Sequence, residues 1–377
     1  MTRHAYIGAE IFDGHHLHQG KALVLDGETF GGIVGAEEVP EDCEVVLLDR
    51  GVLMPGFVDL QVNGGGGVMF NDETSVAGLA TIAAAHATTG TRALLPTLIT
   101  DTPERTRAAV EAVEAAIARN VPGIVGLHLE GPHLSVTRKG AHDPCLIRPM
   151  DDDDEAFLRD AARRLPNLMV TVAPENVTPD RIARLAQAGI IVSLGHTDCT
   201  LTEAEAAFAA GASCVTHLFN AMSQLGNREP GLVGATLGAG SVSAGLIADE
   251  VHVHAVTMGL ALAAKRGPGR IFLVTDAMST VGSNITEFSL NGRRVIRRAN
   301  RLTLEDGTLA GADLEMPTAI SILMERVGIP QETALAMATS GPASVLRDTL
   351  GFGSFEPGKR WNGIHLDPRN RYHAIAA

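Results

Sequence analysis

Four side chains that could carry out metal chemistry lie at or just past the ends of short, strongly apolar runs of this chain. They are Glu130, His196, His217 and Asp276. A carboxylate with two neutral imidazoles is a ligand set suited to a catalytic zinc or similar ion, with positions left for water and substrate. Such an ion supplies hydroxide near neutral pH and polarises a carbonyl, and Asp276 could move the proton to a leaving nitrogen. The pattern predicts metal-assisted hydrolysis.

Parallel strands are the elements that could bring these groups together. From Phe57 onward, apolar runs alternate with longer helical stretches, which is typical of βα units. Eight strands are expected, over residues 57–62, 92–96, 124–129, 168–172, 190–194, 214–218, 244–248 and 271–275. Eight parallel strands close into a (β/α)8 TIM-like barrel, whose strands deliver catalytic groups at their C-terminal ends. Gln61 and Asn63 end the first strand and therefore join the candidate site.

Helix signals fall between the expected strands. Thr102 is a candidate N-cap with Pro103 at the first helical position, a second helix follows Thr200, and a third over residues 75–89 stops at Gly90. Four consecutive aspartates, 151–154, are typical of a solvated helix start. After the eighth strand we expect a hairpin over residues 286–308 and two or three helices between 315 and 350.

Both ends of the chain look extended rather than helical. The first fifty residues contain short alternating runs that suit a small antiparallel sheet, and this segment ends where Pro55 and Gly56 interrupt the pattern. The tail from Gly353 is expected to pair with these strands, because neither piece alone can bury a core. We therefore expect a small β-sandwich domain built from residues 1–54 and 351–377, with the catalytic barrel over 55–350.

Bulk properties exclude several classes of function. The formal charge of −14 argues against nucleic acid or an anionic membrane as a partner, because the average field repels phosphate. The four cysteines show no CxxC pairing, so no disulfide scaffold or zinc ribbon is expected. No apolar segment suits a secretory signal or approaches the roughly 18 residues that span a bilayer. These features favour a cytoplasmic enzyme.

An anionic substrate would need local cations at the mouth of the barrel. Arg228 lies in the glycine-flanked loop GNREPG, and His252 follows two acidic residues; both could meet a phosphate. From the sequence alone, Arg228 could equally be a surface arginine. His252 and His254 form an HxH pair, but it follows the seventh run rather than the first, so we do not expect it to bind metal.

Several stretches of the chain resemble the amidohydrolase superfamily and, within it, the N-acetylglucosamine-6-phosphate deacetylase family. The resemblance covers nearly the whole chain, and the combination of HLEGP with THLFNAM is specific. The matching stretches are PGFVDLQVNGGGG (55–67), HLEGP (128–132), KGAHDP (139–144), SLGHT (193–197), THLFNAM (216–222), GLIAD (245–249), LVTDAM (273–278) and DGTLAGA (306–312). Two departures are His133 directly after HLEGP and the final segment EPGKRWNGIHLD.

The resemblance implies a role for individual residues. It implies that Glu130, His196 and His217 hold one divalent metal ion per subunit and that Asp276 is the catalytic acid and base. Zinc is the expected ion, with Fe2+, Co2+ or Mn2+ as alternatives. It also implies a sugar-phosphate pocket, often completed across a homodimer interface. The residues implied to line that pocket are Ala141, His142, Asn220, Ala221, Arg228, His252, Leu309, Ala310 and Gly311.

The reaction implied is hydrolysis of the acetamide of N-acetyl-D-glucosamine 6-phosphate to glucosamine 6-phosphate and acetate. Two alternatives stay open: the same chemistry on the galactosamine epimer, and a non-catalytic sugar-phosphate-binding barrel. Many superfamily members hold a second metal with an HxH pair at the end of the first strand. Here that place reads Gln61-Val62-Asn63, and amides are poorer ligands than imidazoles, so a single tightly held ion is expected.

Overall fold

Eight parallel strands form a closed barrel at the centre of the chain. The computed structural model describes residues 2–373 and residue 375. The barrel strands follow one another around the sheet in chain order, as expected of a (β/α)8 fold. They are β8 (Phe57–Val62), β11 (Thr91–Ile99), β12 (Leu127–Glu130), β13 (Leu168–Val172), β14 (Ile191–Leu194), β15 (Cys214–Val215), β16 (Ser243–Leu246) and β17 (Ile271–Leu273). A bridge between Val62 and Ala277 closes the ring. The predicted barrel is confirmed.

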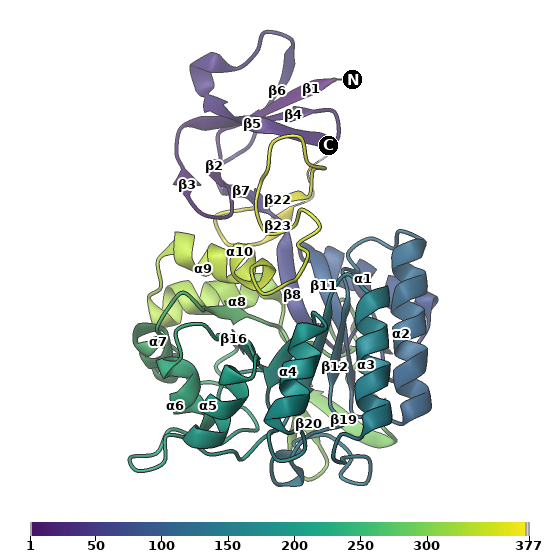
Figure 1. Ribbon diagram of the computed structural model, residues 1–377. Helices are drawn as coiled ribbons and strands as arrows, with labels where there is room; N and C mark the ends of the chain where they lie inside the picture. The colour runs from purple at the N-terminus through teal and green to yellow at the C-terminus, as the bar shows by residue number, and fades with distance from the viewer. Residues whose placement is uncertain (1, 374, 376–377) are drawn as a thin grey trace.

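Helices surround the barrel, as the ribbon view shows (Figure 1). Three predicted helix starts are confirmed: the side chains of Thr102, Asp151 and Thr200 each accept a backbone N–H of the helix that follows. The helices are α1 (Val76–Ala87), α2 (Pro103–Ala118), α3 (Asp152–Arg164), α4 (Pro179–Gln187), α5 (Leu201–Ala209), α6 (Gly231–Gly238), α7 (Ala255–Ala264), α8 (Met316–Ile322), α9 (Gln331–Ala338) and α10 (Ser340–Ala343), with short turns η1 (Ala36–Glu38), η2 (Val136–Arg138) and η3 (Leu323–Val327). Among the described residues, every helix falls short of the length and apolar character needed to cross a bilayer.

The two ends of the chain form two further sheets above the barrel (Figure 1). One contains β1 (Arg3–Ile7), β4 (Lys21–Asp26), β5 (Thr29–Gly35) and β6 (Cys43–Leu47); the other contains β2 (Glu10–Phe12), β3 (Leu17–His18), β7 (Val52–Pro55), β22 (Gly363–Leu366) and β23 (Tyr372–His373). Ile11 and Leu53 of one sheet and Leu23 of the other share an apolar cluster, so the sheets pack face to face. The tail pairs antiparallel with β7, as predicted.

The antiparallel pairing expected at the N-terminus is found for β4 with β1 and β5, but not for every pair of strands. Strand β1 pairs with β6 in parallel, and β2 pairs with β7 in parallel. The strands of this region are short and connected by tight turns, so hydrophobic alternation locates them but does not fix their pairing partners. The strand β7 ends at Pro55 and β8 begins at Phe57, so the chain passes from the small sheets into the barrel within two residues.

A third sheet lies at the opposite end of the barrel from the small sheets (Figure 1). The hairpin expected at residues 286–308 is a four-stranded antiparallel sheet of β18 (Glu287–Leu290), β19 (Arg293–Arg298), β20 (Arg301–Leu304) and β21 (Leu309–Ala312). A small hairpin, β9 (Gly64–Gly65) with β10 (Val68–Met69), lies beside it. Leu290 and Leu302 pack against Met69, Ile99 and Met278. The sheet therefore covers part of the mouth formed by the C-terminal ends of the barrel strands.

Candidate metal centre

Three of the predicted ligands converge at the C-terminal mouth of the barrel. Glu130 is the last residue of β12, while His196 and His217 each lie two residues past the ends of β14 and β15. The Oε1 atom of Glu130 lies 2.9 Å from Nε2 of His196 and 3.0 Å from Nε2 of His217. The two imidazole Nε2 atoms are 3.1 Å apart. Residues separated by up to 87 positions in the sequence thus present three ligand atoms to one point.

The chemistry of these three atoms fits a cation. The Nδ1 atom of His196 lies 2.8 Å from the carbonyl oxygen of Arg138, which can only accept, so Nδ1 carries the proton. In a neutral His196, Nε2 is then the atom whose lone pair would bind an ion. Tetrahedral ligands with bonds of 2.0–2.1 Å lie about 3.3 Å apart, so small outward movements would accommodate a zinc ion. The residues present therefore fit a divalent metal.

Electrostatics at the centre favour an ionised carboxylate. Burial acts to raise the pKa of Glu130, but hydrogen bonds from His196 and His217 outweigh it and hold that pKa well below its usual range. Burial acts to lower the pKa of His217, whereas the hydrogen bond with Glu130 raises it, and the net direction is upward. The imidazoles thus stabilise the negative charge of Glu130, as a bound cation would do in the same place.

The backbone at the site adopts conformations that L-residues rarely use. The φ angles are 49° at His196, 28° at His217 and 52° at Asp276. Left-handed backbone costs about 1–3 kcal/mol for each residue and persists where the surrounding structure holds it in place. Here the left-handed residues lie just past the strand ends, where they turn the chain away from the direction of the strand. Three of the four candidate chemical groups depend on this strained geometry.

Asp276 lies beside the ligand set and is connected to it by amides. Its Oδ1 atom accepts hydrogen bonds from Nδ2 of Asn63 at 2.6 Å and from Nε2 of Gln61 at 3.2 Å. The same Gln61 nitrogen lies 3.1 Å from Oε2 of Glu130. Burial, with the charge of Glu130 close by, raises the pKa of Asp276 to about 6. A carboxyl with this pKa can both accept and return a proton near neutral pH.

A second buried acid, Asp59 on β8, fixes the end of the neighbouring strand β17, which leads to Asp276. Its carboxylate accepts hydrogen bonds from the hydroxyl of Thr275 at 2.5 Å and from the Thr275 backbone N–H at 3.2 Å. Burial raises the pKa of Asp59 to about 7. Asp276 also donates its backbone N–H to the carbonyl of Gln61 at 3.0 Å. These contacts hold the end of β17 against β8 and thereby set the position of Asp276.

His142 is a third imidazole at the centre. Its Nε2 atom lies 4.0 Å from Oε1 of Glu130, and Glu130, His142 and His196 are also close enough to one another to hold an ion. His217 fits the ligand role better, because it lies 1 Å closer to Glu130. The backbone N–H of Thr100 donates to Nδ1 of His142 at 3.3 Å, so Nε2 carries the proton. Burial also lowers the pKa of His142 well below its usual value, which makes it a neutral donor.

A cavity of about 250 Å³ opens in front of these groups. Most of the predicted pocket residues line it together with the metal ligands, Asp276 and Asn63: Ala141, His142, Asn220, Ala221, His252, Leu309 and Gly311. His252 is held by a 2.6 Å contact between its Nδ1 atom and the Asp249 carboxylate. Two predicted residues do not line it within the described part of the chain. Arg228 lies in an exposed loop, and Ala310 packs into the apolar cluster of the third sheet.

Some wall residues were missed from the sequence. Thr100 follows the end of β11 and positions His142, so the strand-end rule that located Glu130 could have found it. Met278, Leu290 and Thr308 also line the cavity. Gly311 has a φ of 64°, and a Cβ there would lie 2.5 Å from Sδ of Met278. Only glycine allows β21 to approach the Asp276 loop this closely.

Comparison with known proteins agrees with this geometry. A model of the amidohydrolase family matches residues 52–376. The N-acetylgalactosamine-6-phosphate deacetylase of Shewanella sp. (strain ANA-3) is 41% identical over 87% of this chain and 82% of its own length. The N-acetylglucosamine-6-phosphate deacetylase of Haemophilus influenzae is 34% identical over 95% of this chain and 93% of its own. The crystal structure of N-acetylglucosamine-6-phosphate deacetylase from Pasteurella multocida superposes with a TM-score of 0.93, at 35% identity, covering 98% and 97% of the two chains.

Proposed function

The chain belongs to the amidohydrolase family, and on that premise we propose that it hydrolyses the acetamide of N-acetyl-D-glucosamine 6-phosphate to D-glucosamine 6-phosphate and acetate. One observation carries the proposal. Glu130, His196 and His217 converge on one point at the barrel mouth, and Asp276 lies beside them with a pKa raised to about 6. A site that only held an ion would gain nothing from that additional acid.

We propose that Glu130, His196 and His217 hold one divalent ion, Zn2+, which would activate water and polarise the amide carbonyl. Asp276 accepts the proton of the attacking water and returns it to the nitrogen as the C–N bond breaks. Asn63 and Gln61 hold the carboxylate in place through its Oδ1 atom. His142 can donate its Nε2 proton to the carbonyl oxygen as negative charge develops there.

The identity of the sugar is the main alternative within this chemistry. A relative named for the galactosamine epimer is 41% identical to this chain, against 34% for one named for the glucosamine substrate. A single inverted hydroxyl can depend on one pocket contact. Acetate release from both N-acetylated sugar phosphates, measured side by side, tests the proposal. Faster turnover of N-acetylgalactosamine 6-phosphate would transfer the assignment to the epimer, and no acetate from either would contradict deacetylation.

The residues at the end of β8 support a single ion. Gln61 and Asn63 stand where many family members carry an HxH pair, and both already donate amide hydrogens to Asp276. We expect elemental analysis of protein loaded with excess zinc and then dialysed to give one equivalent per chain. The Gln61→His/Asn63→His double variant tests whether these two amides are the reason for a single ion. It should gain the capacity to bind a second ion. Two full equivalents in the wild-type protein would contradict this assignment.

We propose that the phosphate of the substrate is bound at the part of the cavity lined by Asn220, Ala221 and His252. Arg228 is on the same side of the barrel but exposed, so it is free to enter the cavity of a second subunit.

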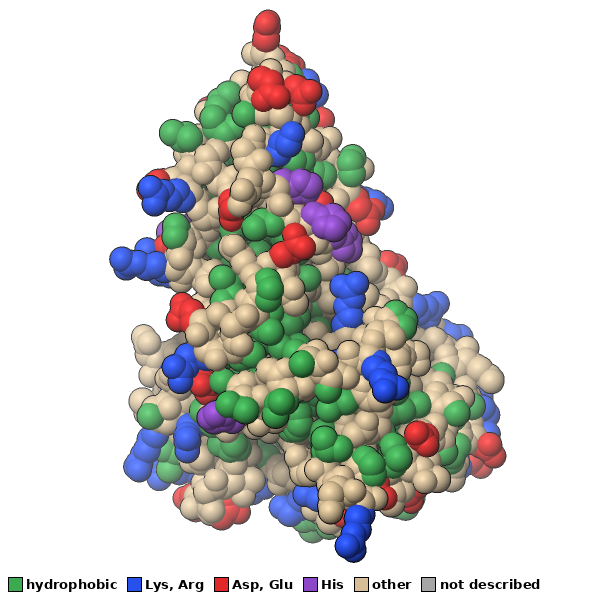
Figure 2. All heavy atoms as spheres, turned by 90° about the vertical axis from the view of Figure 1, so that its left-hand side faces the viewer, with side chains coloured by type: hydrophobic (Ala, Val, Ile, Leu, Met, Phe, Trp, Pro, Cys, Tyr) green, Lys and Arg blue, Asp and Glu red, His purple; other side chains and the backbone are tan. Residues whose placement is uncertain are grey.

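Large hydrophobic side chains are exposed near this loop and on α7. The exposed fractions are 60% for Leu225, 64% for Val256 and 68% for Leu260. Figure 2 shows hydrophobic side chains spread over this face below the small sheets. Such a surface supports a homodimer.

Replacing Arg228 with Ala should raise KM for the phosphorylated sugar about 10- to 100-fold, because a charge-assisted contact to phosphate is worth about 1.5–3 kcal/mol. Hydrolysis of the corresponding sugar without phosphate should change little. Arg266→Ala, which alters an exposed arginine in another loop, is the control and should leave both substrates unaffected. If both substrates lost activity equally in Arg228→Ala, Arg228 would be structural.

We also propose that the enzyme acts in the cytoplasm. Cys43, Cys145, Cys199 and Cys214 are all free thiols, which suits a reducing compartment.

A further inference from the structure

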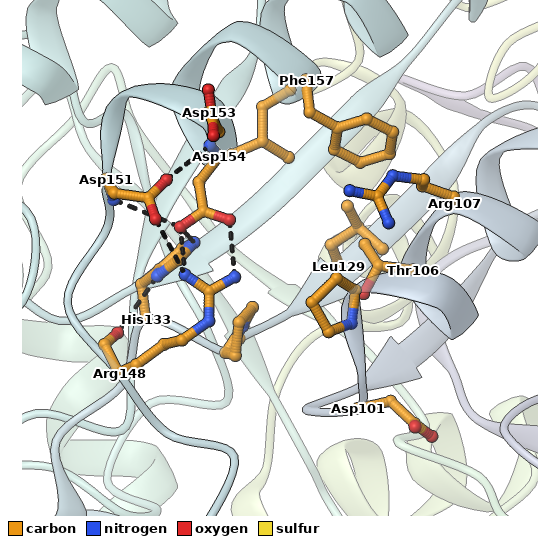
Figure 3. Close-up of a pocket in the computed structure, with 14 residues that line it drawn as sticks. Asp101, Thr106, Arg107, Leu129, His133, Arg148, Asp151, Asp153, Asp154 and Phe157 are labelled. Carbon is orange, nitrogen blue, oxygen red and sulfur yellow. Dashed lines mark hydrogen bonds and ion pairs between the residues drawn. The ribbon is translucent and has the colours of Figure 1, made fainter.

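A second cavity lies outside the barrel, between the N-terminal ends of α2 and α3. It has a volume of about 320 Å³, larger than the cavity at the metal centre. Figure 3 shows its two polar walls: Arg148, His133 and Asp154 lie together on one side, and Arg107 faces them from α2 on the other. Leu129 and the ring of Phe157 form the apolar part of the wall. A concave site in which polar groups converge beside an apolar wall can hold a small molecule.

Buried His133 leaves a hydrogen-bond acceptor facing this cavity. The side chain is 2% exposed, and its Nδ1 atom lies 3.1 Å from the carbonyl oxygen of Arg148. Because a carbonyl only accepts, Nδ1 carries the proton and Nε2 presents a lone pair. Burial lowers the pKa of His133, which favours this neutral form. Nε2 lies 3.7 Å from a carboxylate oxygen of Asp154, which is itself an acceptor. That oxygen already accepts from Arg148 and from the backbone N–H of Asp151, so Nε2 of His133 is the acceptor that a ligand donor in the cavity can satisfy.

The charges of the walls specify what kind of donor fits. Four carboxylates line the cavity, those of Asp101, Asp151, Asp153 and Asp154, against two guanidinium groups. Arg148 is already engaged, because its Nη2 atom binds Asp154 at 2.6 Å. The field near His133 therefore favours a cation. Arg107 is different: its side chain is 57% exposed, and it makes a 3.8 Å ion pair with Glu104 on the same helix. Arg107 remains able to bind an anion at the far wall.

We propose that this cavity is a second ligand site, for a small molecule that carries a primary ammonium group at one end and an anionic group at the other. The ammonium group donates to Nε2 of His133 and to the Asp154 carboxylate, while the anion pairs with Arg107. Asp153, in the first turn of α3, adds to the attraction for the ammonium group. The site itself does not rest on the proposed function, although the expected product, glucosamine 6-phosphate, has this zwitterionic form.

The position of the cavity links it to the metal centre. Glu130 faces the metal site, while Leu129 before it and Gly131 to His133 after it line the second cavity. The neighbouring strand repeats the arrangement, since Thr100 contacts His142 and the next residue, Asp101, lines the second cavity. Both connections are short covalent segments. A ligand at the second site therefore contacts the backbone that positions a metal ligand and the donor His142.

Calorimetric titration of the metal-loaded, full-length protein tests the proposal with three probes. The probes are D-glucosamine 6-phosphate, O-phosphoethanolamine, which keeps the ammonium and phosphate without the sugar, and D-glucose 6-phosphate, which lacks the ammonium. We expect Arg107→Ala and Asp153→Asn each to weaken binding of the two ammonium phosphates at least about tenfold, a change of about 1.4 kcal/mol. Both residues are exposed, so these variants preserve the fold.

Arg105→Ala is the matched control, because Arg105 lies on the same helix but does not line the cavity. It should bind all three probes as the wild type does, and Arg107→Ala should leave glucose 6-phosphate binding unchanged. Unaltered binding of both ammonium phosphates in Arg107→Ala and Asp153→Asn would overturn the site. Equal losses for glucose 6-phosphate would overturn the ammonium requirement. These titrations need no turnover, so absence of acetate release would refute the proposed function without deciding this site.

Discussion

Replacing Asp276 with Asn should abolish most of the turnover while leaving the metal in place. Asp276 lies beside the three proposed metal ligands but is not one of them. Asp276→Asn therefore removes proton transfer without removing a ligand. General acid–base groups contribute about 10²- to 10⁴-fold to rate, and one carboxylate serves both proton transfers here. We expect kcat for acetate release to fall within that range, with little change in KM.

The control for this variant is Asp180→Asn, which alters an exposed aspartate in the first turn of α4. It should release acetate at the wild-type rate. Metal content of Asp276→Asn, measured on the same preparation, should equal that of the wild type. Equal rates in Asp276→Asn and the wild type would remove Asp276 from the mechanism. If the wild type itself released no acetate, the barrel would be a binding protein rather than an enzyme.

Replacing His217 with Asn should reduce metal content and rate together. The Nε2 atom of His217 lies 3.0 Å from Glu130 and 3.1 Å from His196, so its loss removes one of three ligand atoms. Loss of an outer-shell partner alone weakens metal affinity about 10- to 100-fold, and loss of a direct ligand should exceed that. We expect dialysed His217→Asn to retain far less than one equivalent and to recover only part of its rate in excess zinc.

His254→Asn is the matched substitution for this experiment. His254 is exposed, and its side chain caps α7 by accepting the N–H of Val256, a role that Asn also performs. This variant should keep the wild-type metal content and rate. A His217→Asn protein that folded and still bound one tight equivalent would show that His217 is not a ligand. His142 would then be the alternative third donor, given its proximity to Glu130.

Much of the fold could be predicted because the barrel has a strong sequence signal. Its strands are buried on both faces, as all six residues of β8 are, and most of them read as short apolar runs, such as Ile271–Leu273. The C-terminal ends of parallel strands meet at one mouth, so Glu130, His196, His217 and Asp276 could be placed together without knowing any contact. Helix starts were equally local, since Thr102 and Thr200 act through bonds to residues three positions away.

Features that depend on long-range packing could not be predicted. The parallel pairing of β1 with β6 joins short strands whose alternation carries no information on partners. The left-handed backbone of His196, His217 and Asp276 depends on the surrounding structure, because non-glycine residues rarely adopt it unless packing holds them there. A motif that places Ala310 near the substrate does not say which side of β21 faces the cavity, and its side chain packs on the other side.

X-ray diffraction at the zinc absorption edge, from crystals of the zinc-loaded protein, would locate the bound ion. We expect one strong anomalous peak per chain, about 2.0–2.2 Å from an oxygen of Glu130 and from the Nε2 atoms of His196 and His217. Asp276 should lie within reach of a water next to that peak. A strongest peak at any other group of side chains, or none at this one, would contradict the account.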